Sequence, residues 1–334
     1  MRISFLILLG VLSVVLLGNK GQEDLLDVLK AEPKHFPQID YPTDNDITVE
    51  RWKLGKRLFY DPTLSRDSSI SCASCHLPGF AFSDTLAFSL GVEKRVGVRN
   101  APSLANVAYH PYLSRDGGVP SLEMQILVPV QEHLEMDFST LEIADRMMKD
   151  SSYYNESMVA YNRYPDPYVI TRALACFERT LISSNSKYDR VQLGKEEFTV
   201  EEERGHQLFT SERTQCSTCH SGFNFTNYKF ENNGLRIHYS DSGRMRVTKS
   251  EIDRDKFKVP SLRNVELTGP YMHDGSIKRL EEVVGHYSEG IIEHKNLSTG
   301  IKNLYLTENE RKDLVSFLKT LTDPGFCKNN LYTQ

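Results

Sequence analysis

Two copies of one short cysteine motif constrain the fold of this chain more than any other feature of its sequence. Each copy has two cysteines three positions apart followed directly by a histidine: Cys72, Cys75 and His76 in the first, Cys216, Cys219 and His220 in the second. At this spacing two thiols can each add to one vinyl group of a haem while the histidine binds the iron. The sequence therefore predicts two covalently attached c-type haems. A four-cysteine zinc site or redox-active thiol pairs are the alternatives, and the roughly 140 residues between the motifs disfavour a zinc knuckle.

The motifs belong to an internal repeat that organises the whole chain. Residues 55–59 and 205–209 share Gly-x-x-Leu-Phe, and residues 102–107 and 260–265 share Pro-Ser-Leu-x-Asn-Val. An Asp-Gly pair follows each second element at the same distance, at residues 116–117 and 274–275. A repeat of this length predicts two duplicated cytochrome c-like haem domains, residues 46–193 and 194–330. The boundary precedes a capping box, Thr199 with Glu202, which is expected to start the first helix of the second domain.

The remaining pattern is helical, so the predicted fold class is mainly α with long loops around the haems. A second capping box, Thr307 with Glu310, precedes apolar residues at helical spacing, and residues 142–149 and 170–183 have similar spacing. No convincing run of alternating strand residues is present.

Two cysteines lie outside the motifs: Cys176 is predicted to be a buried free thiol, with a disulfide to Cys327 as the alternative.

The N-terminus is typical of an exported protein. The apolar run over residues 5–18 follows a single arginine and is shorter than the ~20 residues that span a bilayer. We therefore expect a signal peptide over residues 1–20, an extended leader with three prolines over 21–45, and a periplasmic location. An uncleaved anchor and a buried N-terminal helix are the alternatives. Because 40 basic residues stand against 45 acidic ones, a nucleic-acid partner is not expected.

With these motifs in place, the chain resembles the bacterial dihaem cytochrome c peroxidases and their relative MauG. The resemblance runs from about residue 46 to residue 326 and includes residues 99–103, 258–265 and 268–275 besides the haem motifs. It implies that the N-terminal haem reacts with hydrogen peroxide and that the C-terminal haem handles electrons. It also implies a calcium ion between the haems, reached by oxygens of Asn100, Thr268 and Pro270.

A peroxide site needs an iron with an open position, a group that moves a proton between the two oxygens, and polar support. Gln125 and Glu135 match the distal pair of the family, and Pro129 lies between them. A carboxyl group in an apolar haem pocket should have a raised pKa, which suits proton transfer. These three residues are the predicted catalytic residues.

Two departures from the peroxidases point toward the MauG branch. Many peroxidases carry a histidine that blocks the N-terminal iron, where this chain has Val92, so we expect that iron to be open in the ferric state. The peroxidases place a methionine fourteen residues after His273, where this chain, like MauG, has Tyr287. Tyr287 is therefore the predicted distal ligand of the C-terminal haem, with His286 and Met272 as rivals. A phenolate should favour ferric or higher-valent iron.

One departure points away from MauG, which keeps a tryptophan between its haems. This chain has Arg115 there, and its only tryptophan, Trp52, is expected to pack in the core. Electrons would then tunnel between haem edges or pass through Tyr109 or Tyr112, and Arg115 is a candidate partner for a haem propionate.

The sequence leaves three functions open. The first is a periplasmic peroxidase that takes electrons from a small cytochrome c or cupredoxin. The second is a MauG-like enzyme that oxidises side chains of a partner protein substrate. The third is a dihaem electron carrier, which the distal residues and the missing histidine disfavour. A homodimer is compatible with each.

Overall fold

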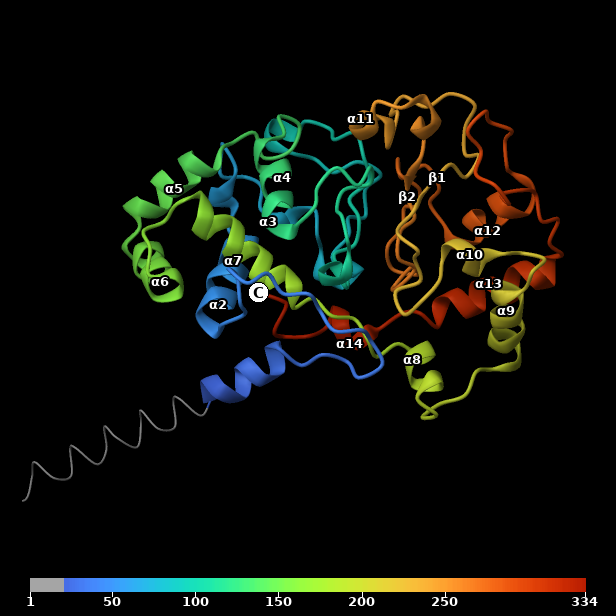
Figure 1. Cartoon of the computed structure of the whole chain (residues 1–334), viewed down its shortest axis with the longest axis horizontal. Coiled ribbons are helices and arrows are strands. Elements are labelled where there is room, and N and C mark those ends of the chain that lie inside the picture. The colour runs from blue at the N-terminus through green and yellow to red at the C-terminus, as the bar shows by residue number, and fades with distance from the viewer. Residues whose placement is uncertain (1–20) are drawn as a thin grey trace, which may run out of the picture.

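The structure, a computed structural model, describes residues 21–334 and consists of two mainly helical lobes (Figure 1). The N-terminal lobe holds α2 (Val49–Tyr60), α3 (Leu122–Gln125), α4 (Leu127–Gln131), α5 (Thr140–Lys149), α6 (Ser151–Tyr161) and α7 (Pro167–Arg179). The C-terminal lobe holds α9 (Val200–Thr210), α10 (Cys216–Cys219), α11 (Met245–Thr248), α12 (Leu280–Glu289) and α13 (Glu308–Lys319). Between them lie α8 (Lys187–Gln192) and α14 (Pro324–Cys327).

Long loops and short 3-10 helices connect these elements. The 3-10 helices cover Pro62–Leu64, Cys72–Ser74, Pro78–Phe80, Val92–Lys94, Val107–Tyr109 and Glu251–Asp253. Over residues 21–334 the only sheet has two antiparallel strands, β1 (Phe230–Glu231) and β2 (Phe257–Lys258), which pair Phe230 with Lys258. The predicted mainly α class with long loops is confirmed.

The duplicated glycine positions set the closest helix crossing in each lobe. In the N-terminal lobe α2 crosses α7, and a Cβ on Gly55 would lie 1.8 Å from the backbone oxygen of Ala173. In the C-terminal lobe α9 crosses α13, and a Cβ on Gly205 would lie 2.0 Å from the backbone oxygen of Asp313. Only glycine lets these backbones approach so closely, so the sequence repeat is also a repeat of packing.

The duplicated asparagines fold the two lobes in the same way. Asn106 and Asn264 both have φ near +60°, a left-handed conformation that asparagine tolerates better than most residues. The side-chain oxygen of Asn106 accepts from the backbone N–H of Ser183 at 2.8 Å, and that of Asn264 accepts from Asp323 at 2.8 Å. Each asparagine therefore links the repeated Pro-Ser-Leu-x-Asn-Val loop of its lobe to the segment that follows the last long helix of that lobe.

Each lobe has its own apolar core, but the C-terminal tail contributes to the first one. Phe326, Cys327 and Tyr332 pack with the core of the N-terminal lobe, where the red end of the chain returns beside α2 and α7 (Figure 1). The same core contains Trp52, whose indole N–H donates to Thr180 at 3.1 Å, as expected for a packing role. Cys176 also lies there, and both it and Cys327 are free thiols, so the disulfide alternative is not formed.

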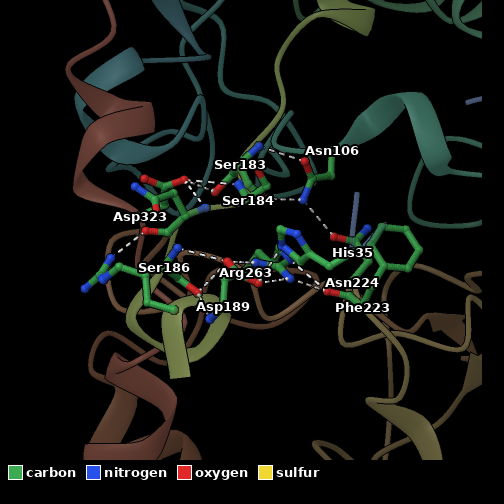
Figure 2. A network of polar contacts seen from close by, with 12 residues as sticks. His35, Asn106, Ser183, Ser184, Ser186, Asp189, Phe223, Asn224, Arg263 and Asp323 are labelled. Carbon is green, nitrogen blue, oxygen red and sulfur yellow. Dashed lines mark hydrogen bonds and ion pairs between the residues drawn. The ribbon is translucent and has the colours of Figure 1, made fainter. Parts of the chain in front are cut away.

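A buried polar network joins the two lobes near α8 (Figure 2). The guanidinium of Arg263 donates to both carboxylate oxygens of Asp189 at 2.7 and 2.8 Å, and to the backbone oxygen of Phe223. Asn106 donates to Asn224 at 3.2 Å across the same junction. Because Asp189 lies on α8, this helix packs on the C-terminal lobe, although the predicted boundary places residues 187–192 in the first domain.

The N-terminal region differs in part from the predicted extended leader. Residues 21–29 are helical, and the segment up to residue 45 is irregular but packs on the protein, with Leu29, Phe36 and Ile39 buried. The predicted signal peptide, residues 1–20, lies outside the described residues. Within residues 21–334, none of the helices has the length and apolar character needed to cross a membrane.

Candidate functional site

A cavity of ≈ 730 Å³ runs between the lobes and is lined by every site residue that the sequence predicted. Its wall contains Cys72, Cys75, His76, Asn100, Gln125, Pro129, Glu135, Cys216, Cys219, His220, Thr268, Pro270 and Tyr287. Residues from both halves of the chain therefore face one connected space, which suits two planar cofactors that exchange electrons.

The two motif histidines are oriented as metal ligands. The Nδ1 of His76 donates to the backbone oxygen of Phe82 at 2.8 Å, and the Nδ1 of His220 donates to that of Phe225 at 3.1 Å. A backbone acceptor fixes the proton on Nδ1 and leaves Nε2 free to bind a metal. The protein surrounding each ring lowers the pKa of both histidines, which favours the neutral form that ligates iron.

The motif cysteines are free thiols that line the same cavity. The 3-10 helix Cys72–Ser74 and helix α10 turn the first pair and the second pair toward that space. Burial raises the pKa of Cys75 to about 11, so its thiol stays neutral until it reacts. The donor set of two thiols and one free imidazole nitrogen in each lobe fits a c-type haem.

The three predicted catalytic residues lie together in the N-terminal lobe. Gln125 ends α3, and its side-chain oxygen accepts from the hydroxyl of Ser114 at 2.9 Å, which leaves its amide N–H groups free to donate. Pro129 lies on α4, and its backbone oxygen accepts from Met136 at 3.1 Å, folding the following turn back over the cavity. Glu135 lies on that turn.

The Glu135 side chain is exposed and lines the cavity. Desolvation by the surrounding protein raises its pKa, and the nearby charge of Glu132 adds to the effect. Its backbone oxygen accepts from Val92 at 2.8 Å, and a Cβ on Gly91 would lie 2.4 Å from that oxygen. The loop that carries Val92 is thus packed tightly against the turn that carries Glu135.

Val92 itself is fully buried and does not line the cavity, where Gly91 takes the adjacent position. No imidazole from residues 89–97 can therefore reach the space beside Gln125 and Glu135. The open distal side that the sequence predicts for the N-terminal haem stays a prediction.

In the C-terminal lobe, two of the three candidate distal ligands line the cavity and the third does not. Tyr287 on α12 lines the cavity, whereas its buried neighbour His286 donates from Nε2 to the backbone oxygen of Asn233 at 3.0 Å and does not line it. Met272 also lines the cavity, and its sulfur accepts from the side chain of Asn233 at 3.3 Å. Burial raises the pKa of Tyr287, so its phenolate needs a cation beside it.

Comparison with known proteins identifies the family. The family described as "Di-haem cytochrome c peroxidase" matches residues 49–197, and the family described as "Cytochrome c" matches residues 202–322. The methylamine utilization protein MauG of Methylorubrum extorquens is 37% identical over 310 residues, which cover 91% of this chain and 87% of that protein. The chain belongs to the di-haem cytochrome c peroxidase and MauG family.

The relatives of this chain include cytochrome c peroxidases as well as MauG proteins. The cytochrome c551 peroxidase of Nitrosomonas europaea is 35% identical, with 81% of this chain and 79% of that protein covered. A crystal structure of a MauG-like protein associated with microbial copper homeostasis is 33% identical, with a TM-score of 0.86 over 90% of this chain and 97% of that one. As a member of this family, the chain is a haem-dependent oxidoreductase of the peroxidase type.

Sequence reasoning missed a group of basic side chains in the wall between the lobes. Lys258 donates to the backbone oxygen of Tyr112 at 2.9 Å and lies 3.3 Å from Nδ1 of His110. Desolvation, helped by the charge of Arg115, lowers the pKa of Lys258 to about 7. Arg99 pairs with Asp116 and Asp241 at 2.7 and 2.6 Å. The sequence shows these residues but not that the two lobes bring them together.

Proposed function

We propose that the protein is an exported peroxidase with two covalently attached haems, in which the N-terminal lobe reduces hydrogen peroxide to water and the C-terminal lobe relays electrons. The reaction takes one peroxide, two electrons and two protons and yields two waters. The electron donor would be a small cytochrome c or cupredoxin in the periplasm. One observation carries the proposal: Gln125 and Glu135 face the same enclosed space as the free Nε2 side of His76.

The site residues of the N-terminal lobe would each have a separate role in peroxide reduction. His76, Cys72 and Cys75 would hold a haem, which would supply the redox-active iron for peroxide reduction. Glu135, with its raised pKa, would take the proton from the near peroxide oxygen and return it to the far one. The amide of Gln125 would donate a hydrogen bond to the peroxide, and Pro129 would keep the turn closed over it.

Tyr287 supports a second candidate function, oxidation of a partner protein in the manner of MauG. A phenolate is a hard anionic donor and stabilises ferric iron or a higher oxidation state more than a thioether does. A haem ligated by Tyr287 would be a poor relay for electrons from a cytochrome. It would instead store oxidising equivalents and withdraw electrons from a protein substrate.

Two measurements test these proposals. Ferric EPR spectra before and after one equivalent of peroxide should show an open, high-spin haem that reacts without prior reduction. Steady-state oxidation of reduced cytochrome c then separates the functions: many turnovers per second favour the peroxidase, and slow turnover with a long-lived oxidised state favours MauG-like chemistry. Low-spin spectra from both haems with no response to peroxide would overturn both and leave an electron carrier.

Substitution of Glu135 tests the catalytic assignment. Glu135→Gln keeps the shape of the side chain and removes its ability to move a proton, so peroxide reactivity should fall by a factor of about 100 or more. Glu197→Gln is the matched control, because Glu197 is exposed and does not line the cavity. Equal reactivity of the two variants would remove Glu135 from the mechanism.

A further inference from the structure

Asn100, the residue that the family resemblance assigns to calcium, binds the cationic side chain of Arg115 with both its oxygens. Its side-chain oxygen accepts from Nη2 of Arg115 at 2.6 Å, and its backbone oxygen accepts from Nε of the same residue at 2.8 Å. Asn100 is buried, so no alternative water-facing position is open to its side chain. Asn100 therefore does not fit the predicted calcium ion, because calcium could bind it only by displacing the guanidinium.

The guanidinium is held firmly where the lobes meet. The backbone oxygen of Arg115 accepts from the backbone N–H of Lys258 at 2.7 Å, and the backbone N–H of Asn100 donates to His273 at 3.0 Å. Both members of the Arg115–Asn100 pair are thus tied through their main chains to the C-terminal lobe. The planar fork of arginine offers two parallel donors, which matches the two oxygens of Asn100.

The charges around this pair also oppose a divalent cation. The charges of Arg99 and Asp274 both act on Arg115, with opposite sign. The carboxylate of Asp274 is paired with Arg236 at 2.6 Å, and those of Asp116 and Asp241 are paired with Arg99 at 2.7 and 2.6 Å. A calcium ion at Asn100 would therefore meet the guanidinium of Arg115 directly, and each of these three carboxylates is already paired with an arginine.

We propose that the guanidinium of Arg115 takes the place of the inter-haem calcium ion, so that this protein carries a built-in cation between its haems. The position is occupied by a single charge fixed to the chain instead of a double charge that exchanges with solution. Chelators should therefore leave this enzyme unchanged, and its haem spectra should not depend on calcium.

The first test uses the wild-type holoprotein and does not involve turnover. Elemental analysis after dialysis should find well under one calcium per chain. The ferric EPR spectrum and the thermal unfolding midpoint should stay the same in excess EGTA and in excess calcium. One tightly held calcium per chain, or an EPR spectrum that changes on chelation and recovers with calcium, would overturn the proposal.

The second test removes the guanidinium. Arg115→Gln frees the oxygens of Asn100 and deletes one like charge, so calcium affinity should rise on the order of 100-fold. It would appear as an unfolding midpoint that calcium raises and EGTA lowers. Arg246→Gln is the matched control, because Arg246 also lines the cavity, is exposed, and loses the same charge. If calcium shifts the unfolding midpoint of neither variant, Arg115 does not occupy the cation position. If Arg115→Gln fails to fold, the wild-type measurement still decides.

Discussion

Replacing Arg263 by methionine should destabilise the junction between the lobes by much more than an ordinary surface substitution. Its side chain is 1% exposed and that of Asp189 is 2% exposed. Arg263→Met would leave the Asp189 carboxylate buried without its cation, and the Phe223 carbonyl would lose two donors. Removing one member of such a buried pair costs about 3–5 kcal/mol in the free energy of unfolding.

The chain offers a control with the same geometry and a different environment. Arg254 also donates to both oxygens of a carboxylate, that of Glu251, at 2.7 and 2.6 Å. However, the two side chains are 35% and 62% exposed, and ion pairs that water surrounds contribute little to stability. Arg254→Met should therefore have little effect on stability.

The loss of stability in Arg263→Met should depend on pH. Burial alone would raise the pKa of Asp189, but the hydrogen bonds and charge of Arg263 outweigh it and lower the pKa below the ordinary 3.8. A lowered pKa in the folded state stabilises the protein above the unfolded pKa, and that contribution is lost as the pH falls through the folded value. The deficit of Arg263→Met should be largest near neutral pH and should shrink below about pH 4.

Urea unfolding of the holoprotein, followed by far-ultraviolet circular dichroism at several pH values, measures these differences. The expected result is a large, pH-dependent loss for Arg263→Met and a small one for Arg254→Met. Similar small losses for both variants would refute the reasoning, because burial would then not decide the strength of the pair.

Three further predictions concern the lobes separately. Gly55→Ala should lower the thermal unfolding midpoint, because its Cβ would overlap the backbone of α7 and overpacking costs about 1–3 kcal/mol; Gly285→Ala on α12, with open space around it, should be neutral or stabilising. Burial raises the pKa of Glu178 to about 8, so the folded protein should lose stability as pH rises from 4.5 to 8, and Glu178→Leu, which copies the repeat-equivalent Leu318, should abolish that slope in a pH series of unfolding midpoints. Tyr287→Met should raise the reduction potential of the C-terminal haem in spectroelectrochemistry, and an unchanged potential would exclude Tyr287 as its ligand.

Local chemistry made much of this protein predictable from its sequence. The capping boxes at Thr199 and Thr307 depend only on residues three positions apart, and both are formed. The expected helix over 170–183 ends earlier, at Arg179, where the chain turns at Thr180.

Contacts between distant segments were not predictable in the same way. Nothing in the local pattern shows that Arg115 binds both oxygens of Asn100, or that α8 packs on the second lobe through Asp189 and Arg263. The helix over residues 21–29 was also missed, because the prolines that suggested an extended leader all follow it. The pair of Asp189 with Arg263 depends on how the lobes meet, which a repeat pattern does not encode.

The return of the C-terminal tail to the first lobe has a consequence for how the protein matures. Phe326 and Tyr332 fill the same core as Leu58 and Phe59, so the first lobe cannot complete its core until this late segment of the chain is available. Domains usually fold in order along the chain, but here the first lobe must wait for a segment that follows the second. Removing the residues from Phe326 onward, or fusing a bulky tag to them, should therefore damage the N-terminal haem pocket and spare the C-terminal one.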